Sequence, residues 1–261
     1  MRLKLYKKVE PRKGWWLGLF TFAFVLVIWQ LVAASGWVKP YFLPSPVQVV
    51  GALVDLSLNH DLAAHIGVSV WRVGAGFVLA AMVAIPLGLL IGTHGPSAAA
   101  FAPFNDFLRY MPVVAFVPLC ILWAGIGDEQ KILVIFLGIV FQLVPMVADA
   151  TAAVPRVFVE TAATLGLNNR NIFQRVVWPA AQPQIFDHLR VAVGWGWSYI
   201  VVAELVAAER GIGHVIIQAQ RFLRTDQVMA GILAVGLLGL ITDLIFRQVG
   251  RHIYGWHESK R

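Results

Sequence analysis

The sequence predicts an all-α protein that crosses a membrane several times. Its 261 residues are 59% hydrophobic and only 13% charged, and its mean hydropathy of +0.72 is far too high for a soluble domain of this size. Crossing about 30 Å of hydrocarbon takes roughly 20 apolar helical residues. Six segments come near that length: 15–35, 66–93, 100–125, 131–154, 187–208 and 228–249. The alternating pattern of a membrane barrel is missing, so we expect six transmembrane helices in one domain, 15–249.

Basic residues set the expected orientation. The net charge is +7, and Lys and Arg gather in the tails 1–14 and 250–261 and in the loop 155–186, whereas acidic residues offset the cations of the opposite loops, Lys131 among them. The positive-inside rule then places both termini and the loop 155–186 in the cytoplasm. Because the basic residues form no stripe with interleaved aromatics, we expect membrane lipid and no nucleic acid as a partner.

The first apolar segment is expected to stay in the protein as a membrane anchor. The run from Trp15 to Ala34 is longer than the apolar region of a signal peptide. No convincing small-x-small cleavage pattern ends it.

Between the first two spans, the sequence predicts an amphipathic helix on the outer surface. Ser45 can cap it and Pro46 suits its first turn. One face of this helix is apolar and consists of Val47, Val50, Val54 and Leu58. Such a helix would lie at the membrane interface; a simple linker with a proline turn is the alternative.

Two central spans carry residues that suit either helix packing or a solute path. Gly88 and Gly92 have the spacing that lets membrane helices approach closely. In the next span, Asp106 and Arg109 are three residues apart and can form an ion pair. Two prolines, Pro112 among them, interrupt that helix, and ionisable residues beside a broken membrane helix are candidates for a functional site. A structural pair that fixes helix register is the alternative.

The fifth span combines aromatic residues with a carboxylate. Glycine alternates with Trp195 and Trp197, which places close backbone contacts beside wide aromatic faces. Glu204 lies in an apolar run, where an acid at mid-membrane costs about 2.5–3.5 kcal/mol on insertion scales. A neighbouring helix or water must therefore supply hydrogen bonds to it.

The loop 155–186 contains a long polar interval, Glu160 to Pro179, which must face water or a soluble partner. Residues 160–165 suit a short helix that Gly166 can end in the left-handed conformation. Asn168 and Asn169 can cap a second helix, which Pro179 would end or kink. We expect a helical platform at the membrane surface.

This platform resembles a motif of import-type ABC permeases: E-A-A, three residues, G, nine residues, I, one residue, L-P. The positions that match at the required spacing are Glu160, Ala162, Gly166 and Pro179; those that differ are Thr161, Val176 and Trp178. In that family the loop forms coupling helices that insert into a groove on the ATP-binding subunit. The resemblance implies this role for Glu160, Thr161, Ala162, Gly166, Val176 and Pro179. An ordinary amphipathic loop is the alternative.

Three further segments resemble the branch of these permeases that handles taurine, alkanesulfonates, nitrate and bicarbonate. They are F-L-P-x-P at 42–46, W-x-G-I-G at 123–127, and V-x-A-E-L with G-[IL]-G at 201–213. The resemblance implies the type I importer permease fold and places Glu204 near the outer gate, with a structural bond to a neighbouring helix as the alternative. Candidate residues of the translocation path or gate are Asp106, Arg109, Trp195, Trp197 and Glu204.

Membership of that family would also imply partners. They are a second permease copy in a homodimer, two ATP-binding subunits docked at the 155–186 loops, and a periplasmic or lipoprotein solute-binding protein. The complex would work in a bacterial inner membrane by alternating access. Its solute would be a small molecule, with a sulfonate, nitrate or bicarbonate anion favoured.

The sequence shows no motif for chemistry of its own. It has no GxxxxGK[ST] phosphate loop, so ATP and Mg²⁺ are expected on the partner ATPase and no cofactor on this chain. HExxH, GxSxG and spaced Ser/His/Asp sets are also missing, and the single cysteine, Cys120, excludes an intramolecular disulfide. We expect a non-catalytic transport subunit without catalytic or metal-binding residues.

An ion-gradient-driven secondary transporter is the main alternative function. It would relay ions through acidic residues such as Asp106, Glu204 and Asp243, although Asp243 can instead pair with Arg247 four residues on. We detect no inverted repeat that would support it.

Overall fold

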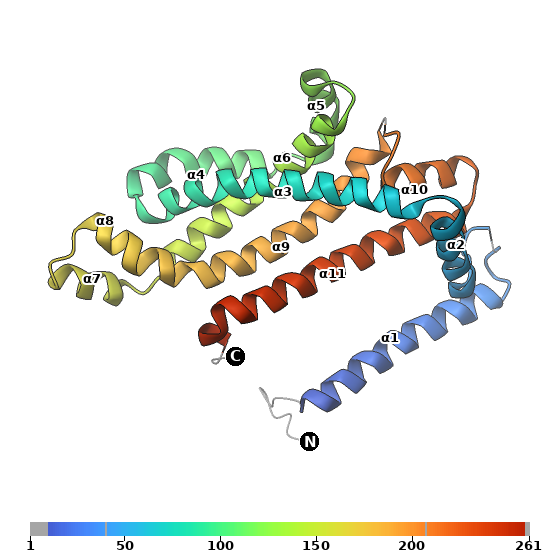
Figure 1. Cartoon of the computed structure of the whole chain (residues 1–261), viewed down its shortest axis with the longest axis horizontal. Coiled ribbons are helices and arrows are strands. Elements are labelled where there is room, and N and C mark those ends of the chain that lie inside the picture. Colours follow the sequence, from blue (N-terminus) through green and yellow to red (C-terminus); the bar gives the residue numbers. More distant parts are fainter. Residues whose placement is uncertain (1–9, 40, 207, 259–261) are drawn as a thin grey trace.

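The computed structural model describes residues 10–39, 41–206 and 208–258, and every regular element within them is a helix (Figure 1). This confirms the predicted all-α class. The elements along the chain are α1 (Pro11–Ala34), α2 (Pro46–Asn59), α3 (Leu62–Thr93), α4 (Gly95–Arg109), a 3-10 turn (Val113–Phe116), α5 (Val117–Ala124), α6 (Asp128–Ala152), α7 (Arg156–Thr164), α8 (Asn169–Ile172), a π-helical turn (Phe173–Val177), α9 (Trp178–Leu205), α10 (Ile212–Arg221) and α11 (Thr225–Glu258).

The predicted number of six spans is not confirmed. Within the described residues, four helices are long and apolar enough to cross a membrane by themselves, namely α1, α3, α6 and α11. A fifth crossing results if α4 and the segment Val113–Ala124 count as one span, although they meet at 89°. Helix α9 has 28 residues but is not among them, because charged residues such as Arg190 and Glu204 lower its hydropathy.

Several helices extend beyond the predicted spans. Helix α1 begins at Pro11 and α11 continues to Glu258, so helix covers parts of both predicted tails; residues 1–9 and 259–261 lie outside the described part of the chain. Helix α9 begins at Trp178, well before position 187. The first turns of α1 and the last turns of α11 point away from α2 and α10, in the direction of α7 and α8 (Figure 1).

The hydrophobic core lies where α3, α6 and α9 pack together, with α11 alongside. Glycines bring α3 close to α6. A Cβ on Gly88 would lie 2.6 Å from the Cβ of Val147, and one on Gly92 would lie 2.6 Å from the carbonyl oxygen of Ala148. The predicted close packing is therefore confirmed, and both glycines face α6.

Helix α2 confirms the predicted cap but packs through a different face. The Ser45 hydroxyl accepts a hydrogen bond from the Gln48 backbone N–H, and the Gln48 side chain accepts one from the Ser45 N–H. The residues buried against the protein are Val49, Ala52 and Leu56. The predicted apolar face is exposed: Val47, Val50, Val54 and Leu58. Both faces are thus apolar, and the outward one suits contact with lipid.

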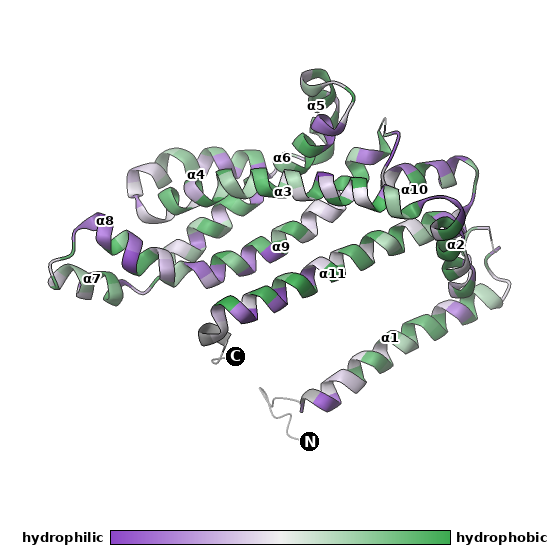
Figure 2. Ribbon diagram, in the orientation of Figure 1, coloured by the Kyte–Doolittle hydropathy of each residue, from purple (hydrophilic) through white to green (hydrophobic). Residues whose placement is uncertain are grey.

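Polar residues gather at the two ends of the bundle, around α8 and around α10, while α1 is apolar along most of its length (Figure 2). Within the described residues α1 also has no buried side chain in its most apolar window. This distribution is expected of a body whose middle lies in hydrocarbon and whose ends lie in water.

Candidate functional site

The first candidate site is the elbow, which we define as residues 156–177. Helix α7 ends in a turn in which Gly166 has φ +82°. The Gly166 N–H donates to the Ala163 carbonyl at 2.9 Å and the Leu167 N–H donates to the Ala162 carbonyl at 3.1 Å. This pair of bonds is the Schellman ending, which requires the left-handed conformation that glycine adopts without strain. The predicted glycine cap is confirmed.

The second helix of the elbow is capped as predicted. The Asn168 side-chain oxygen accepts a hydrogen bond from the Asn171 backbone N–H at 2.9 Å. Ala162, Ile172 and Val177 then bury their side chains against each other. The elbow therefore has a small core of its own.

The sequence predicted that Pro179 would end or kink the second helix of the elbow. Pro179 does not end it, because the helix continues and Pro179 lies in the first turn of α9. A proline ring clashes with the carbonyl four residues earlier, here that of Arg175. The π-helical turn over Phe173–Val177 widens the backbone at that point, so the chain stays helical from Asn169 to Leu205.

The elbow presents both polar and apolar side chains to its surroundings. Glu160, Thr161 and Gly166 are exposed, Ala162 is buried, and Val176 and Pro179 are half-buried. Large apolar side chains are also exposed there, namely Val157, Phe158 and Leu165. Exposed apolar residues on a water-facing projection are typical of a protein-binding surface.

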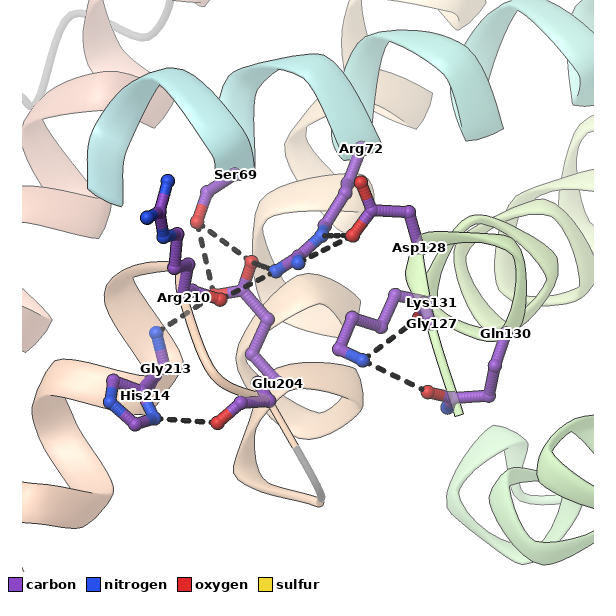
Figure 3. A network of polar contacts seen from close by, with 12 residues as sticks. Ser69, Arg72, Gly127, Asp128, Gln130, Lys131, Glu204, Arg210, Gly213 and His214 are labelled. Carbon is purple, nitrogen blue, oxygen red and sulfur yellow. Dashed lines mark hydrogen bonds and ion pairs between the residues drawn. The ribbon is translucent and has the colours of Figure 1, made fainter. Parts of the chain in front are cut away.

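The second candidate site lies at the other end of α9. Glu204 is fully buried. Its carboxylate accepts hydrogen bonds from the Ser69 hydroxyl at 2.8 Å, from Arg72 Nη1 at 2.7 Å and from the Gly213 backbone N–H at 2.8 Å (Figure 3). The predicted need for a hydrogen-bonding neighbour is thus met by α3 and by the first turn of α10.

Arg72 connects Glu204 to α6. Its side chain is 5% exposed, and its Nε and Nη2 donate to Asp128 Oδ1 at 2.9 and 2.6 Å. We call Ser69, Arg72, Asp128 and Glu204 the outer charge network. Sequence reasoning overlooked Arg72; the available signal was an arginine within an apolar helix, which must find a buried partner or water.

The outer charge network also holds the segment 208–213. The Ile212 N–H donates to Ser69 Oγ at 3.0 Å, and Arg72 Nη1 donates to the Arg210 carbonyl at 2.7 Å. A Cβ on Gly213 would lie 2.5 Å from the Cβ of Glu204, so only glycine lets the backbone reach the carboxylate. The glycines of the G-[IL]-G segment therefore have a steric explanation.

Lys131 is buried, although the sequence placed it in an outer loop. Its side chain is 2% exposed, and its ammonium donates to the Gly127 carbonyl at 2.9 Å and to Gln130 Oε1 at 3.5 Å (Figure 3). It lies in the first turn of α6, beside a cavity of about 370 Å³ that Arg72, Asp128 and Arg210 also line. Burial follows because α6 packs on α3 and α9 at this level.

The break between α4 and α5 carries the third set of candidates. Arg109 Nε lies 3.1 Å from Asp106 Oδ1, which confirms the predicted pair; the side chains are 32% and 49% exposed. The Nε–H is buried and does not point at a hydrogen-bond acceptor. The Gln142 side chain donates to the Arg109 carbonyl at 3.2 Å and fixes the end of α4. The backbone of Arg109 is therefore held in place, while its Nε–H has no hydrogen-bond acceptor among the described residues.

The two tryptophans of α9 differ in their surroundings. Trp195 is half-buried, whereas Trp197 is 4% exposed and donates from Nε1 to Thr242 Oγ1 at 3.1 Å. Trp197 thus holds α9 against α11. Farther along α11, Asp243 pairs with Arg247 at 3.1 Å, as predicted, and also with Arg190 of α9.

Within the described residues, no group of three or more His, Cys, Asp or Glu side chains is placed to hold a metal ion. The candidate sites consist of an exposed elbow, a buried network of charges and an arginine at a helix break. Such sites suit protein contact, helix positioning and anion contact.

Comparisons with known proteins agree on one family. Residues 84–254 match the family described as binding-protein-dependent transport system inner membrane component. The taurine transport system permease protein TauC of Escherichia coli (strain K12) is 32% identical, with 98% of each chain covered. The nitrate import permease protein NrtB of Synechocystis sp. is 31% identical, with 85% of this chain and 82% of that protein covered. A chain of the inward-facing MetNI methionine ABC transporter has the same fold, with a TM-score of 0.67 at 14% identity over 74% of this chain and 95% of that one.

Proposed function

Because this chain belongs to the family of binding-protein-dependent transport system inner membrane components, we propose that two copies of it enclose a path for a small oxyanion, such as a sulfonate or nitrate. The chain is a permease subunit of an ABC importer, and its relatives favour this function over an ion-gradient-driven transporter. The anion is proposed because the relatives include taurine and nitrate permeases.

The elbow is the proposed contact with the ATP-binding subunit. The observation that supports this most is its construction: α7 ends in a capped turn, and the second helix of the elbow continues without a break from Asn169 into α9. Force applied at α7 would pass through the small core of the elbow to this second helix, and from there to α9. In this proposal Glu160 and Thr161 contribute polar contacts, Gly166 sets the turn, and Ala162, Val176 and Pro179 hold the shape. ATP and Mg²⁺ would then be bound by the partner, with both termini and the elbow in the cytoplasm.

Arg109 is the proposed contact for the anion inside the membrane. Helix α4 has 15 residues, so Arg109 lies about 22 Å from the α3–α4 turn at 1.5 Å per residue. A half-buried arginine at that depth cannot turn its charge to lipid and requires a water-filled cavity or a second protein surface. Asp106 beside it would moderate the positive charge, so that an anion binds and is also released, and Trp195 would border the same space.

Glu204 and Trp197 are proposed to position helices without touching the solute. Glu204 is fully buried, and its carboxylate is occupied by Ser69, Arg72 and Gly213. In this role Glu204 sets the outer gate by fixing the segment 208–213 to α3. The charge of Glu204 is neutralised by Arg72, so Glu204 does not repel an anion in a nearby path.

The proposed function is tested at the elbow. In Gly166→Val a β-branched residue occupies the left-handed conformation, which strains the turn. We expect the variant to stay in the membrane but to lose co-purification of the ATP-binding subunit and solute-stimulated ATP hydrolysis. The matched control is Gly95→Val in the first turn of α4, where no atom lies within 4 Å of the added Cβ and φ is ordinary. Uptake by Gly166→Val that continues on an ion gradient, with no ATPase bound, would contradict the proposal.

A further inference from the structure

A cavity of about 590 Å³ lies at the end of the bundle opposite the elbow, between α2, α3, α10 and α11. Its volume falls within the roughly 300–1,000 Å³ that is typical of small-molecule sites. Its polar lining consists of His60, His65, His214, Gln218, Arg224 and Gln227. The outer charge network and the elbow lie elsewhere, so the proposed transport function does not use this cavity.

Arg224 is the charged residue of the lining. It is exposed, and no hydrogen bond or ion pair to its guanidinium is found among the described residues. It borders a second, smaller cavity of about 220 Å³ as well. An exposed arginine beside two cavities, whose guanidinium makes no hydrogen bond or ion pair within the described part of the chain, can bind an oxyanion through paired N–H donors.

The backbone holds Arg224 firmly. Helix α10 ends in a Schellman turn, in which the Arg224 N–H donates to the Ala219 carbonyl at 2.8 Å and the Leu223 N–H donates to the Gln220 carbonyl at 3.0 Å. Leu223 occupies the left-handed position with φ +58°, where a residue with a Cβ is strained. A strained turn that fixes the backbone at an exposed cation is a feature associated with functional sites.

The histidines define what the cavity can offer a ligand. His65 Nδ1 accepts a hydrogen bond from the Gly211 N–H at 3.1 Å, so a neutral His65 carries its proton on Nε2 as a donor. His214 Nδ1 lies 2.6 Å from the Ala208 carbonyl and therefore donates to it. With the amide of Gln218, the lining supplies donors around the guanidinium.

Two carboxylates lie near Arg224: Asp55, which contacts residues that line this cavity, and Asp226, which lines the smaller one. The hydrogen bond from Asn59 lowers the pKa of Asp55 below its ordinary value, burial opposes this effect, and the positive charge of Arg224 adds to the lowering. Asp55 is therefore ionised at neutral pH, and it lies 3.6 Å from His60 and 3.5 Å from Gln227. The negative charge of Asp55 weakens anion binding at Arg224. Removing that charge should therefore strengthen anion binding, which gives a second test of the site.

The rest of the lining is apolar: Leu56, Val215, Ala219 and Phe222. Helix α11, which is long and apolar enough to cross a membrane, begins at Thr225, directly after Arg224. We therefore expect Arg224 near the interface where lipid headgroups meet hydrocarbon. We propose that this cavity binds an amphiphilic oxyanion, a phosphate or sulfonate group on an alkyl chain, with the anion on Arg224 and the chain along the apolar wall. The ligand is either a phospholipid or a soluble alkanesulfonate.

Two probes separate these sources. The full-length chain in neutral detergent is titrated with 1-octanesulfonate by calorimetry, and retention of phosphatidylglycerol is measured by native mass spectrometry against diacylglycerol, which lacks the phosphate. We expect at least one probe to bind saturably. Binding of phosphatidylglycerol alone identifies a lipid site, and binding of octanesulfonate alone identifies a site for soluble sulfonates.

Three variants decide whether Arg224 is the anion contact. Arg224→Gln should weaken binding about tenfold or more, as expected for the loss of a charge-assisted hydrogen bond. Arg221→Gln, an exposed arginine that does not line the cavity, should leave it unchanged, and Asp55→Asn should strengthen it. Failure of both probes to bind, an equal loss in Arg221→Gln, or weaker binding in Asp55→Asn would overturn the proposal. Unfolding temperatures of all variants exclude misfolding as the cause.

Discussion

The elbow and the outer charge network lie at opposite ends of α9 and are built in opposite ways. The elbow is held by bonds between residues that are close in sequence, such as those at Gly166 and Asn168. The network joins residues far apart in sequence, with Glu204 bonded to Arg72 across 132 positions. The elbow is exposed, whereas Glu204 and Arg72 are buried. The exposed elbow suits a surface that binds a partner, whereas the buried outer charge network suits a fixed contact between several helices.

The comparison predicts that damage to the network spreads through the whole molecule. In Arg72→Met the carboxylate of Glu204 stays buried without its cation, and breaking a buried pair in this way costs about 3–5 kcal/mol. We expect the largest fall in unfolding temperature for this variant, measured in detergent. Adding Glu204→Gln should restore much of the loss, since the uncompensated charge is removed. A single variant as stable as the parent chain would show that water already solvates Glu204.

A smaller loss of stability is expected at Gly213, whose backbone contacts the outer charge network at Glu204. A methyl group on Gly213 would lie 2.5 Å from the Cβ of Glu204 and 3.1 Å from the carbonyl oxygen of Val201. Gly213→Ala should therefore cost about 1–3 kcal/mol, as overpacked cores do, again seen as a lower unfolding temperature. Gly194→Ala in α9 has no atom within 4 Å of the new carbon and should leave stability unchanged or slightly higher. Equal effects at the two sites would contradict the structure.

The smallest effect on the whole molecule is expected at the elbow. Asn168→Ala removes the cap of α8, which is worth about 1 kcal/mol to a helix. Because the elbow has its own small core, we expect faster hydrogen exchange at residues 169–172 and little change in the unfolding temperature. Asn169→Ala is the control, since Asn169 supplies no cap. A large drop in global stability would mean that the elbow is not a separate unit.

The same contrast explains how much could be predicted from the sequence. The caps at Ser45, Gly166 and Asn168 were predictable because they depend on a few neighbouring residues. The close packing at Gly88 was predictable from spacing alone.

The partners within the network were not predictable in this way. An acid in an apolar run predicts that Glu204 needs hydrogen bonds. No local sequence pattern identifies Arg72 as the donor, because their contact depends on how α3 and α9 pack. Lys131 was misplaced for a related reason: it lies at the start of a helix, where sequence alone does not distinguish an exposed turn from one covered by neighbouring helices. The bend at Arg109 was signalled by Pro112, whereas its angle of 89° was not.

The separation of Arg72 from Glu204 has a consequence for how the protein is made. At about 5–20 residues per second, the ribosome needs roughly 7–26 s to advance the 132 positions from one to the other. During that interval the nascent α3 carries an arginine whose later carboxylate partner does not yet exist. Asp128 is synthesised earlier and also binds Arg72, so it can act as a temporary counter-ion until α9 is inserted. Of the two acidic partners of Arg72 in the finished protein, Asp128 is therefore the one that the order of synthesis makes available first.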